Sequence, residues 1–183
     1  FVRYDGGRPP HLLTMFPSLR ERTVVANSVS KTYAMTGWRL GYGILPEELV
    51  PHIVKLAVNS VSCAASFTQK AAVAAIEGPR DEVEAMVAEF AIRRRLIADG
   101  LRSIPGINCP EPEGAFYAFP SIKGTGLTSM EFETKAMNEA GVALLSGSAF
   151  GEFGEGYVRL SYANSQDNIQ KAISQLDKMV RSI

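Results

Sequence analysis

Hydrophobic residues recur along this chain with two different periods, which predict strands and helices that alternate. Apolar or alternating runs predict strands at about residues 23–28, 39–45, 115–119, 142–145 and 157–162. Apolar residues at helical spacing predict helices at about residues 46–58, 66–76, 80–103 and 129–140, and a last one from Ser165 onward. Residues 1–22, with their prolines and glycines, are expected to be irregular connection. This mixture predicts an α/β fold.

Hydroxyl residues predict where several of these helices begin. Thr128 and Glu131 have the spacing of a capping box, Ser165 is expected to cap the last helix, and Ser66 or Thr68 the helix at 66–76. Two apolar stripes are expected to be buried: Leu49, Ile53, Leu56 and Ala57 on the helix at 46–58, and Ile169, Ala172, Ile173, Leu176 and Val180 on the last helix. Gly78-Pro79 is the clearest break in the chain and predicts a domain boundary.

Composition indicates a globular protein without a charged partner. The 183 residues are 46% hydrophobic, which is enough to form a core. Lys plus Arg is 19 and Asp plus Glu is 19, so no electrostatic attraction to nucleic acid or to an acidic membrane is expected. We interpret the run Arg93-Arg94-Arg95 as a solvated helix face. No apolar run is long enough to span a membrane.

The cysteines argue against a secreted protein held by disulfides, and the histidines against a metal-binding protein. Cys63 and Cys109 are far apart and predict free thiols, as in the reducing cytoplasm, and no secretory signal is recognised at the start of the chain. His11 and His52 lie in no metal-ligand pattern, so no metal site is expected.

The stretch from Asn27 to Gly43 carries the chemistry. Because Val24 and Val25 are β-branched, the run before it is expected to be a buried strand. Lys31 follows that strand, and a lysine at a buried strand end is more tolerable as a neutral amine or in an imine. The Ser28 hydroxyl, backbone N–H groups and the Arg39 guanidinium are donors that bind a phosphate. An imine-forming lysine beside a phosphate site predicts pyridoxal phosphate as cofactor.

These residues also resemble a known family. Ser28-Val29-Ser30-Lys31 followed by Gly37-Trp38-Arg39-Leu40-Gly41 resembles the lysine motif of the class I and II aminotransferases, which are fold-type I pyridoxal-phosphate enzymes. The resemblance implies that Lys31 is catalytic and holds the cofactor as an imine, with Ser28 and Arg39 on the cofactor phosphate. It covers only the C-terminal part of a family member, and the residues that contact the cofactor ring would precede Phe1.

The resemblance also implies a domain organisation. Residues 1–78 would close a large cofactor-binding domain with a mainly parallel sheet, and residues 79–183 would form a small α+β domain. The loop at residues 59–65 has two readings: in the family it lies near a dimer interface beside the neighbouring cofactor phosphate, and otherwise it is an ordinary loop. The likeness implies a homodimer in the cytoplasm.

The strand at residues 157–162 contains a candidate substrate site. Its alternation predicts that Arg159 and Ser161 share one face, opposite Val158, Leu160 and Tyr162. The sequence Val-Arg-Leu-Ser-Tyr-Ala resembles the family strand whose arginine binds the substrate carboxylate, so the likeness assigns that role to Arg159. The neighbouring Phe116 and Tyr117 are expected to pack in the core.

The resemblance implies an aminotransferase that moves an amino group between an α-amino acid and a 2-oxo acid. The chain itself, as a fragment, is expected to be inactive alone. Two alternatives stay open: another fold-type I reaction, such as that of a β-lyase, a synthase or a decarboxylase, and a ligand-sensing domain of a transcription regulator.

Overall fold

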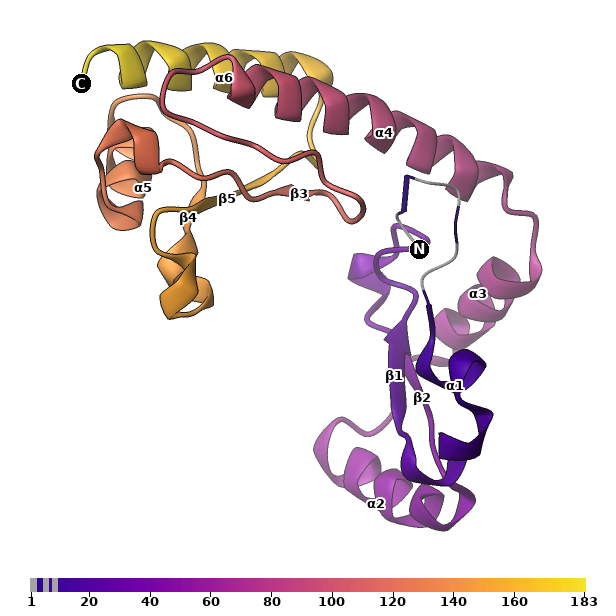
Figure 1. Ribbon diagram of the computed structural model, residues 1–183. Coiled ribbons are helices and arrows are strands. Elements are labelled where there is room, and N and C mark those ends of the chain that lie inside the picture. Colours follow the sequence, from indigo (N-terminus) through magenta and orange to yellow (C-terminus); the bar gives the residue numbers. More distant parts are fainter. Residues whose placement is uncertain (1–2, 5–6, 8–9) are drawn as a thin grey trace. The chain divides into compact units, whose positions relative to one another are not determined.

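The computed structural model describes residues 3–4, 7 and 10–183 and divides them into two compact units (Figure 1). Unit 1 comprises the described residues of Gly7–Ala85, and unit 2 comprises residues 3–4 and Met86–Ile183. The units therefore divide within one helix, α4 (Asp81–Arg102). The domain boundary at Gly78-Pro79 stays a prediction; it falls in the link that precedes this helix.

Both units contain helices and short strands. In unit 1 these are α1 (Leu12–Met15), β1 (Val25–Ser28), β2 (Gly41–Ile44), α2 (Val50–Ser60) and α3 (Ser66–Glu77). In unit 2 they are most of α4, then β3 (Tyr117–Ala118), α5 (Ser129–Asn138), β4 (Leu145–Ser146), β5 (Val158–Ser161) and α6 (Gln166–Arg181). Short 3-10 helices lie at Pro17–Arg22, Thr36–Trp38, Glu47–Leu49, Lys123–Thr125, Gly147–Phe150 and Glu152–Gly154.

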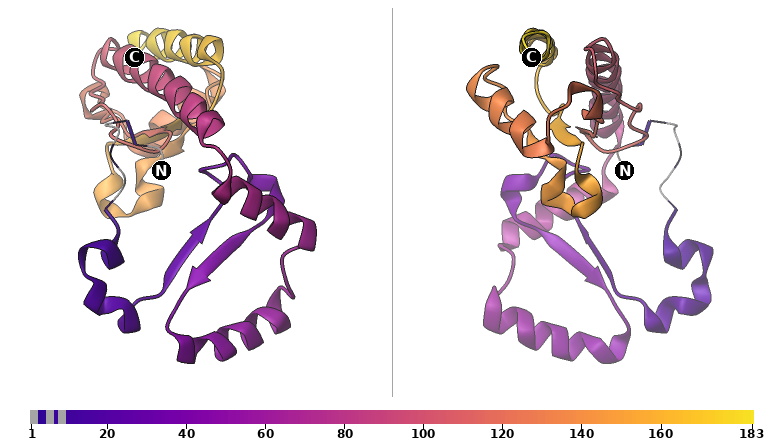
Figure 2. Two further views of the ribbon diagram at one scale, coloured as in Figure 1. Left: turned by 90° about the vertical axis from the view of Figure 1, so that its right-hand side faces the viewer. Right: turned by 60° about the vertical axis from the view of Figure 1, so that its left-hand side comes forward.

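Unit 1 is built on the hairpin of β1 and β2, which run antiparallel (Figure 2). Ser28 is paired with Gly41 at one end of the ladder, and Val25 with Ile44 at the other. This portion therefore contributes an antiparallel pair to a sheet that was predicted to be mainly parallel. A small buried cluster of Val29, Met35 and Ala72 lies beside the connection between the strands.

Two burial predictions for unit 1 are wrong. Residues 23–28 are not a buried strand: Val24 is 58% exposed, β1 is at most half-buried and β2 is exposed throughout. The predicted stripe on α2 is also exposed, with Leu56 at 65%. The physical reason is the same in both places: a two-stranded ladder and one amphipathic helix need other elements to cover them, and the described part of unit 1 does not supply these elements.

Local chemistry explains other differences in unit 1. Residues 12–22 were expected to be irregular but form α1 and a 3-10 helix, because the His11 side chain caps α1 and Pro17 starts the second. Neither Ser66 nor Thr68 caps α3, which begins after Ala65 without a side-chain cap. Thr68 lies instead within the helix and is buried.

Unit 2 is an α+β unit around one hydrophobic core. Its sheet has the order β3-β5-β4 with both pairs antiparallel, so β5 is the central strand. β4 begins at Leu145, later than the predicted run at 142–145, because its pairing starts opposite Arg159. The largest fully buried side chains include Tyr162, Phe132, Leu101, Ile104, Ile122 and Leu176. They come from the sheet region, from helices α4, α5 and α6, and, for Ile104, from the segment that follows α4.

The helix signals in unit 2 are confirmed. Thr128 and Glu131 form the predicted capping box of α5, and the Ser165 side chain accepts the Asn168 N–H at the start of α6. The stripe on α6 packs against the core, joined by Met179, which the prediction omitted. The interpretation of Arg93-Arg94-Arg95 as a solvated face is wrong for Arg94, whose side chain is 19% exposed. Spacing gives the reason, because Phe90, Arg94 and Ile97 share the inner face of α4.

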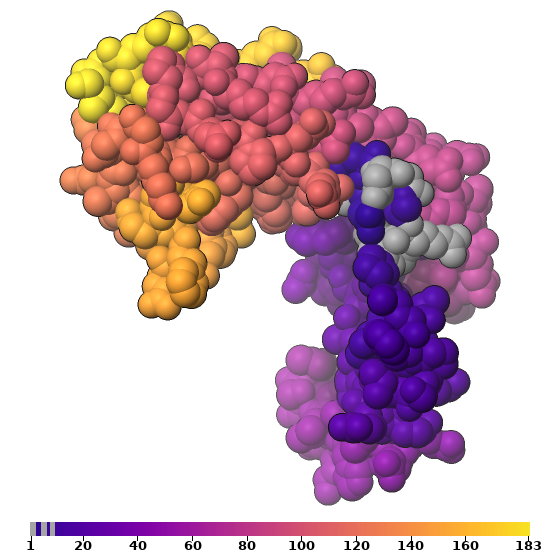
Figure 3. All heavy atoms as spheres, viewed as in Figure 1, coloured from indigo at the N-terminus to yellow at the C-terminus, as the bar shows by residue number. Residues whose placement is uncertain are grey.

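The loop between β4 and β5 projects from unit 2 as a lobe, drawn in light orange (Figure 3). Two glycines hold its base together: a Cβ atom on Gly147 would collide with the Gly154 carbonyl oxygen, and one on Gly154 with that of Gly147. The buried Ser129 hydroxyl accepts the Gly156 N–H at 2.8 Å on the return of the loop. This loop carries Phe150 to the edge of the sheet.

Candidate functional site

Ser28 lies at the closed end of the β1–β2 hairpin. Ser28 is paired with Gly41, so residues 29–40 form the connection between the two strands. The Ser28 side chain is half-buried, and its Oγ accepts the Ser30 N–H at 3.3 Å. Because that contact uses a lone pair, the hydroxyl proton remains available for a ligand.

Lys31 lies in the turn that follows β1 and is exposed. The turn is fixed by the Tyr33 N–H, which donates to the Val29 carbonyl at 3.2 Å. Val29 is fully buried, and Thr32 is 7% exposed, so the residues around the lysine anchor the turn. Lys31 itself is exposed, however, so the expectation that it lies at a buried strand end is not met within the described part of unit 1.

Arg39 follows the short helix Thr36–Trp38 in a left-handed backbone conformation, with φ +52°. Its Nη1 donates to the Thr36 carbonyl at 2.9 Å, which leaves other N–H groups of the guanidinium for a ligand. A left-handed conformation is costly for a residue with a Cβ atom. The predicted strand from residue 39 begins only at Gly41 for this reason.

A cleft of about 990 Å³ adjoins Arg39 within unit 1. Its walls come from residues 34–41, from the segment between α2 and α3 with Ser62 and Cys63, and from the first turn of α3 with Thr68. Trp38 and Phe67 meet edge to face across 6.3 Å between ring centroids. Arg39 and Gly41 line this cleft, whereas Ser28 and Lys31 do not.

The sequence-predicted site residues of unit 1 therefore share one end of one hairpin. Ser28 ends β1, Lys31 lies in the connection, and Arg39 lies just before β2. A hydroxyl, a guanidinium and turn N–H groups form a donor set that suits a dianionic phosphate. The loop predicted at 59–65 begins only after Ser60, where α2 ends, and its small residues line the cleft.

Arg159 lies on the central strand of unit 2. As predicted, Val158 and Leu160 are buried while Arg159 and Ser161 share the other face. The Arg159 guanidinium contacts two rings, with Cζ 4.5 Å from the Tyr117 centroid and 4.4 Å from the Phe150 centroid. Among the residues that the structure describes, none forms an ion pair with Arg159 or accepts a hydrogen bond from it. Its planar donor edge is therefore available to a carboxylate.

The neighbouring aromatic residues divide between two roles. Phe116 packs against the core and stacks on Phe90 at 5.8 Å, as predicted. Tyr117 was also expected in the core, but its ring covers Arg159 instead. The register gives the reason: Tyr117 is paired with Ser161, so it lies on the face that Arg159 shares.

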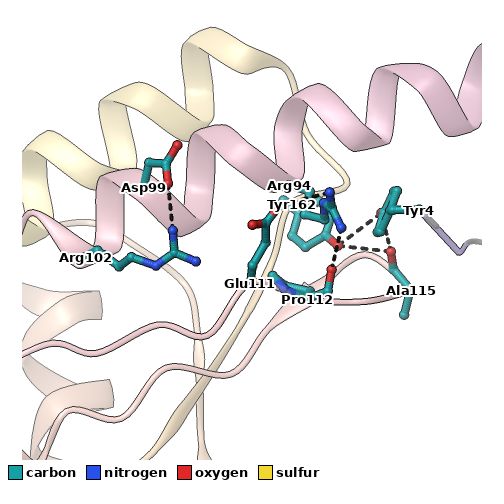
Figure 4. Close-up of polar contacts among 8 residues, drawn as sticks. All are labelled: Tyr4, Arg94, Asp99, Arg102, Glu111, Pro112, Ala115 and Tyr162. Atoms are coloured by element: carbon teal, nitrogen blue, oxygen red, sulfur yellow. Dashed lines mark hydrogen bonds and ion pairs between the residues drawn. The ribbon is translucent and has the colours of Figure 1, made fainter.

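A polar cluster that joins Tyr4, near the start of the chain, to residues of α4 and the sheet region was not predicted (Figure 4). The Tyr4 hydroxyl donates to the Ala115 carbonyl at 2.5 Å and lies 3.1 Å from the Tyr162 hydroxyl. Arg94 covers the Tyr4 ring at 4.4 Å and pairs with Glu111 at 2.9 Å. The cluster ties the described residues 3–4 to unit 2.

Burial changes the titration of several groups in unit 2. It raises the pKa of Tyr4 and, more strongly, that of Tyr162, whose pKa the Tyr4 hydroxyl raises further. Burial also raises the pKa of the Cys109 thiol to about 11. In the described residues both cysteines are free, with Cys63 exposed. No cluster of three or more potential metal ligands occurs among them, and none of their helices is long and apolar enough to cross a membrane.

Comparison with known proteins agrees with the lysine motif. The chain matches the family model for aminotransferase class I and II over residues 9–176, and it therefore belongs to this family. It is 43% identical over 163 residues to an aspartate aminotransferase of Pyrococcus horikoshii, covering 86% of this chain and 41% of that protein. It is 41% identical over 179 residues to a probable N-acetyl-LL-diaminopimelate aminotransferase of Bacillus subtilis, covering 98% and 44%.

Solved structures give the same result for the fold. An aspartate aminotransferase from Rhizobium meliloti superposes with a TM-score of 0.93 at 35% identity, covering 98% of this chain and 47% of that one. An aromatic aminotransferase from Pyrococcus horikoshii gives 0.92 at 38% identity, covering 99% and 48%. The predicted fold class, part of a fold-type I aminotransferase, is confirmed. The chain spans less than half the length of these relatives.

Proposed function

We propose that this chain is the C-terminal part of a pyridoxal-phosphate-dependent aminotransferase that moves an amino group between an α-amino acid and a 2-oxo acid. The observation that supports this most directly is the placement of Ser28, Lys31 and Arg39 at one end of the β1–β2 hairpin. Family membership over most of the chain supports it independently. We further propose that residues 1–78 belong to the large domain and residues 79–183 to the small one.

The cofactor phosphate would be bound by side chains that have hydrogen-bond donors available for it. Ser28 retains its hydroxyl proton, and Arg39 retains N–H groups beyond the one on Thr36, so both would bind the cofactor phosphate. Lys31 would hold the cofactor covalently through Nζ. When bound, pyridoxal phosphate supplies an aldehyde that accepts the amino group and a ring that withdraws electrons from the substrate Cα.

Lys31 would then act as the acid and base of the reaction. Its Nζ, released when an amino acid binds, would take the proton from the substrate Cα, and in the return half it would give a proton back to the Cα of the new amino acid. This work requires a neutral amine. Because Lys31 is exposed here, the covering that favours the neutral form would come from other parts of the complete protein.

Arg159 would bind the α-carboxylate that every amino-acid substrate carries. Its guanidinium has no ion-pair partner among the described residues, and its planar fork suits a carboxylate. By fixing the carboxylate, Arg159 would fix which bond at Cα faces Lys31. It would recognise amino acids and 2-oxo acids alike, without choosing between side chains.

We propose that the complete protein is a cytoplasmic homodimer whose partners are amino acids and 2-oxo acids, with neither nucleic acid nor membrane as partner. The free cysteines support a reducing compartment, and balanced charge gives no attraction to nucleic acid. Exposed apolar residues on α2, such as Ile53 and Leu56, support coverage by further polypeptide. The loop at 59–65 would lie near the dimer interface.

Incubating the complete protein with pyridoxal phosphate, 2-oxoglutarate and ¹⁵N-labelled aspartate or aromatic amino acids tests the proposal. We expect labelled glutamate by mass spectrometry, lost in Lys31→Ala and retained in Lys55→Ala, where another exposed lysine of unit 1 is removed. Release of ammonia without a new amino acid would indicate a β-lyase, release of carbon dioxide a decarboxylase, and a rearranged amino acid that keeps its own amino group a synthase. Binding without turnover of any substrate would favour a sensing domain.

A further inference from the structure

Two aromatic rings hold the Arg159 guanidinium, and neither belongs to its own strand. Cζ lies 4.5 Å from the Tyr117 centroid and 4.4 Å from the Phe150 centroid, both well within the range of cation–π attraction. The two rings make no ring contact with each other, as judged within the described residues, so they approach the guanidinium from different sides. Arg159 is therefore held between two rings.

The sheet register explains how Tyr117 reaches Arg159. Tyr117 is paired with Ser161, two residues beyond Arg159 on the same face of β5. Diagonal neighbours of this kind lie within reach of aromatic and long side chains. Tyr117 is itself supported by Phe116, whose ring centroid is 4.6 Å away.

Phe150 reaches Arg159 from the edge of β5 that pairs with β4, whereas Tyr117 comes from the edge that pairs with β3. β4 pairs Leu145 with Arg159, and the lobe that follows β4 begins with the 3-10 helix Gly147–Phe150. The Phe150 ring meets Phe119 edge to face at 6.0 Å, and Phe119 stacks on Tyr157 at 5.6 Å. Phe150 is 50% exposed yet held in place by this row of rings.

We propose that Tyr117 and Phe150 are positioning residues that act through Arg159. Their rings restrain the guanidinium from two sides and leave its N–H groups, from which no described residue accepts a hydrogen bond, to meet a carboxylate. A guanidinium fixed in this way loses less side-chain entropy when a ligand binds. The inference rests on the proposed role of Arg159 and adds the groups that orient it.

The test measures carboxylate binding with and without each ring. Acetate presents the recognised group alone, and its Kd for the cofactor-free complete protein is measured by ligand-observed NMR, with acetamide as neutral reference. Tyr117→Leu and Phe150→Leu should each raise the Kd of acetate and the KM of amino-acid substrates about threefold to tenfold, since each removes one cation–π contact. The kcat should change little, and Tyr117→Phe and Phe150→Tyr should restore binding to within about twofold.

Phe153→Leu is the matched control. Phe153 lies in the same lobe, is 91% exposed and makes no ring contact with a described residue, so its loss should change neither Kd nor KM. Thermal unfolding of every variant identifies any that fail to fold, and the two leucine variants test the idea independently. Equal weakening by Phe153→Leu, or unchanged acetate binding in both folded leucine variants, would overturn the positioning role.

Arg159→Lys separates this inference from the proposed function. It keeps the charge but loses the planar fork. If this variant binds acetate as tightly as the unmodified protein, Arg159 is not the carboxylate site and the proposed function loses that residue. If Arg159→Lys weakens acetate binding while neither leucine variant does, Arg159 keeps its role and only the positioning by Tyr117 and Phe150 is refuted.

Discussion

Arg39 combines a strained backbone with a proposed ligand contact, so two substitutions there can separate the effect of the backbone on stability from the loss of cofactor affinity. Its φ is +52°, and the left-handed conformation costs a residue with a Cβ atom about 1–2 kcal/mol. Glycine removes that cost but loses about 0.5–1 kcal/mol through greater freedom in the unfolded chain. Arg39→Gly should therefore be more stable than Arg39→Ala, which retains the strain, by up to about 1.5 kcal/mol.

Cofactor affinity should fall in both variants. A hydrogen bond to a charged group contributes about 1.5–3 kcal/mol, which corresponds to a Kd about tenfold to a hundredfold weaker. The hydrogen bond from Arg39 to Thr36 is lost in both, so their difference in stability isolates the backbone. Arg20→Ala is the control, since it removes another exposed arginine of unit 1.

Two measurements on the complete protein are needed. Absorbance titration of the cofactor-free form gives the Kd of pyridoxal phosphate, and urea unfolding gives the free energy of unfolding without cofactor. Unchanged cofactor affinity in both variants would remove Arg39 from the phosphate site. A glycine variant less stable than the alanine variant would refute the account of the backbone strain.

Three further predictions concern single residues. Borohydride reduction of the cofactor-loaded complete protein, followed by peptide mapping, should label Lys31. Ser129→Ala should lower the free energy of unfolding by about 1–3 kcal/mol, because it leaves the buried Gly156 N–H without its acceptor. Iodoacetamide at pH 8 should alkylate the exposed Cys63 and spare Cys109 in the folded protein, because burial raises the pKa of Cys109 to about 11 and so keeps the thiol protonated there.

Each of these has its own control. A label on Lys55, or none despite bound cofactor, would refute the assignment of Lys31. Ser103→Ala, the control for Ser129→Ala, removes an exposed hydroxyl and should change the free energy of unfolding by less than about 0.5 kcal/mol. If Ser129→Ala loses no more stability than this control, the buried acceptor role is contradicted. Rapid alkylation of Cys109 in native protein, with the same rate as in urea, would show that its site is open.

The sequence by itself determined features that depend on neighbouring residues. The capping box of Thr128 and Glu131, the cap at Ser165 and the alternation around Arg159 are confirmed, because each involves residues within about four positions of one another. The lysine motif lies within one continuous stretch, residues 28–41, and it indicated the family that the comparisons confirmed. The roles of Ser28, Lys31, Arg39 and Arg159 remain predictions.

Only the tertiary structure decided which distant residues meet. The Tyr117 ring on Arg159 and the contact between Tyr4 and Tyr162 join segments far apart in the chain, and the fold of the loop after β4 returns Phe150 to Arg159. Strand register and loop geometry create these contacts, and neither follows from the local period of a sequence. Burial in unit 1 was predicted wrongly for a related reason: hydrophobic periodicity shows that a face can be covered, whereas exposure depends on whether a covering element is present.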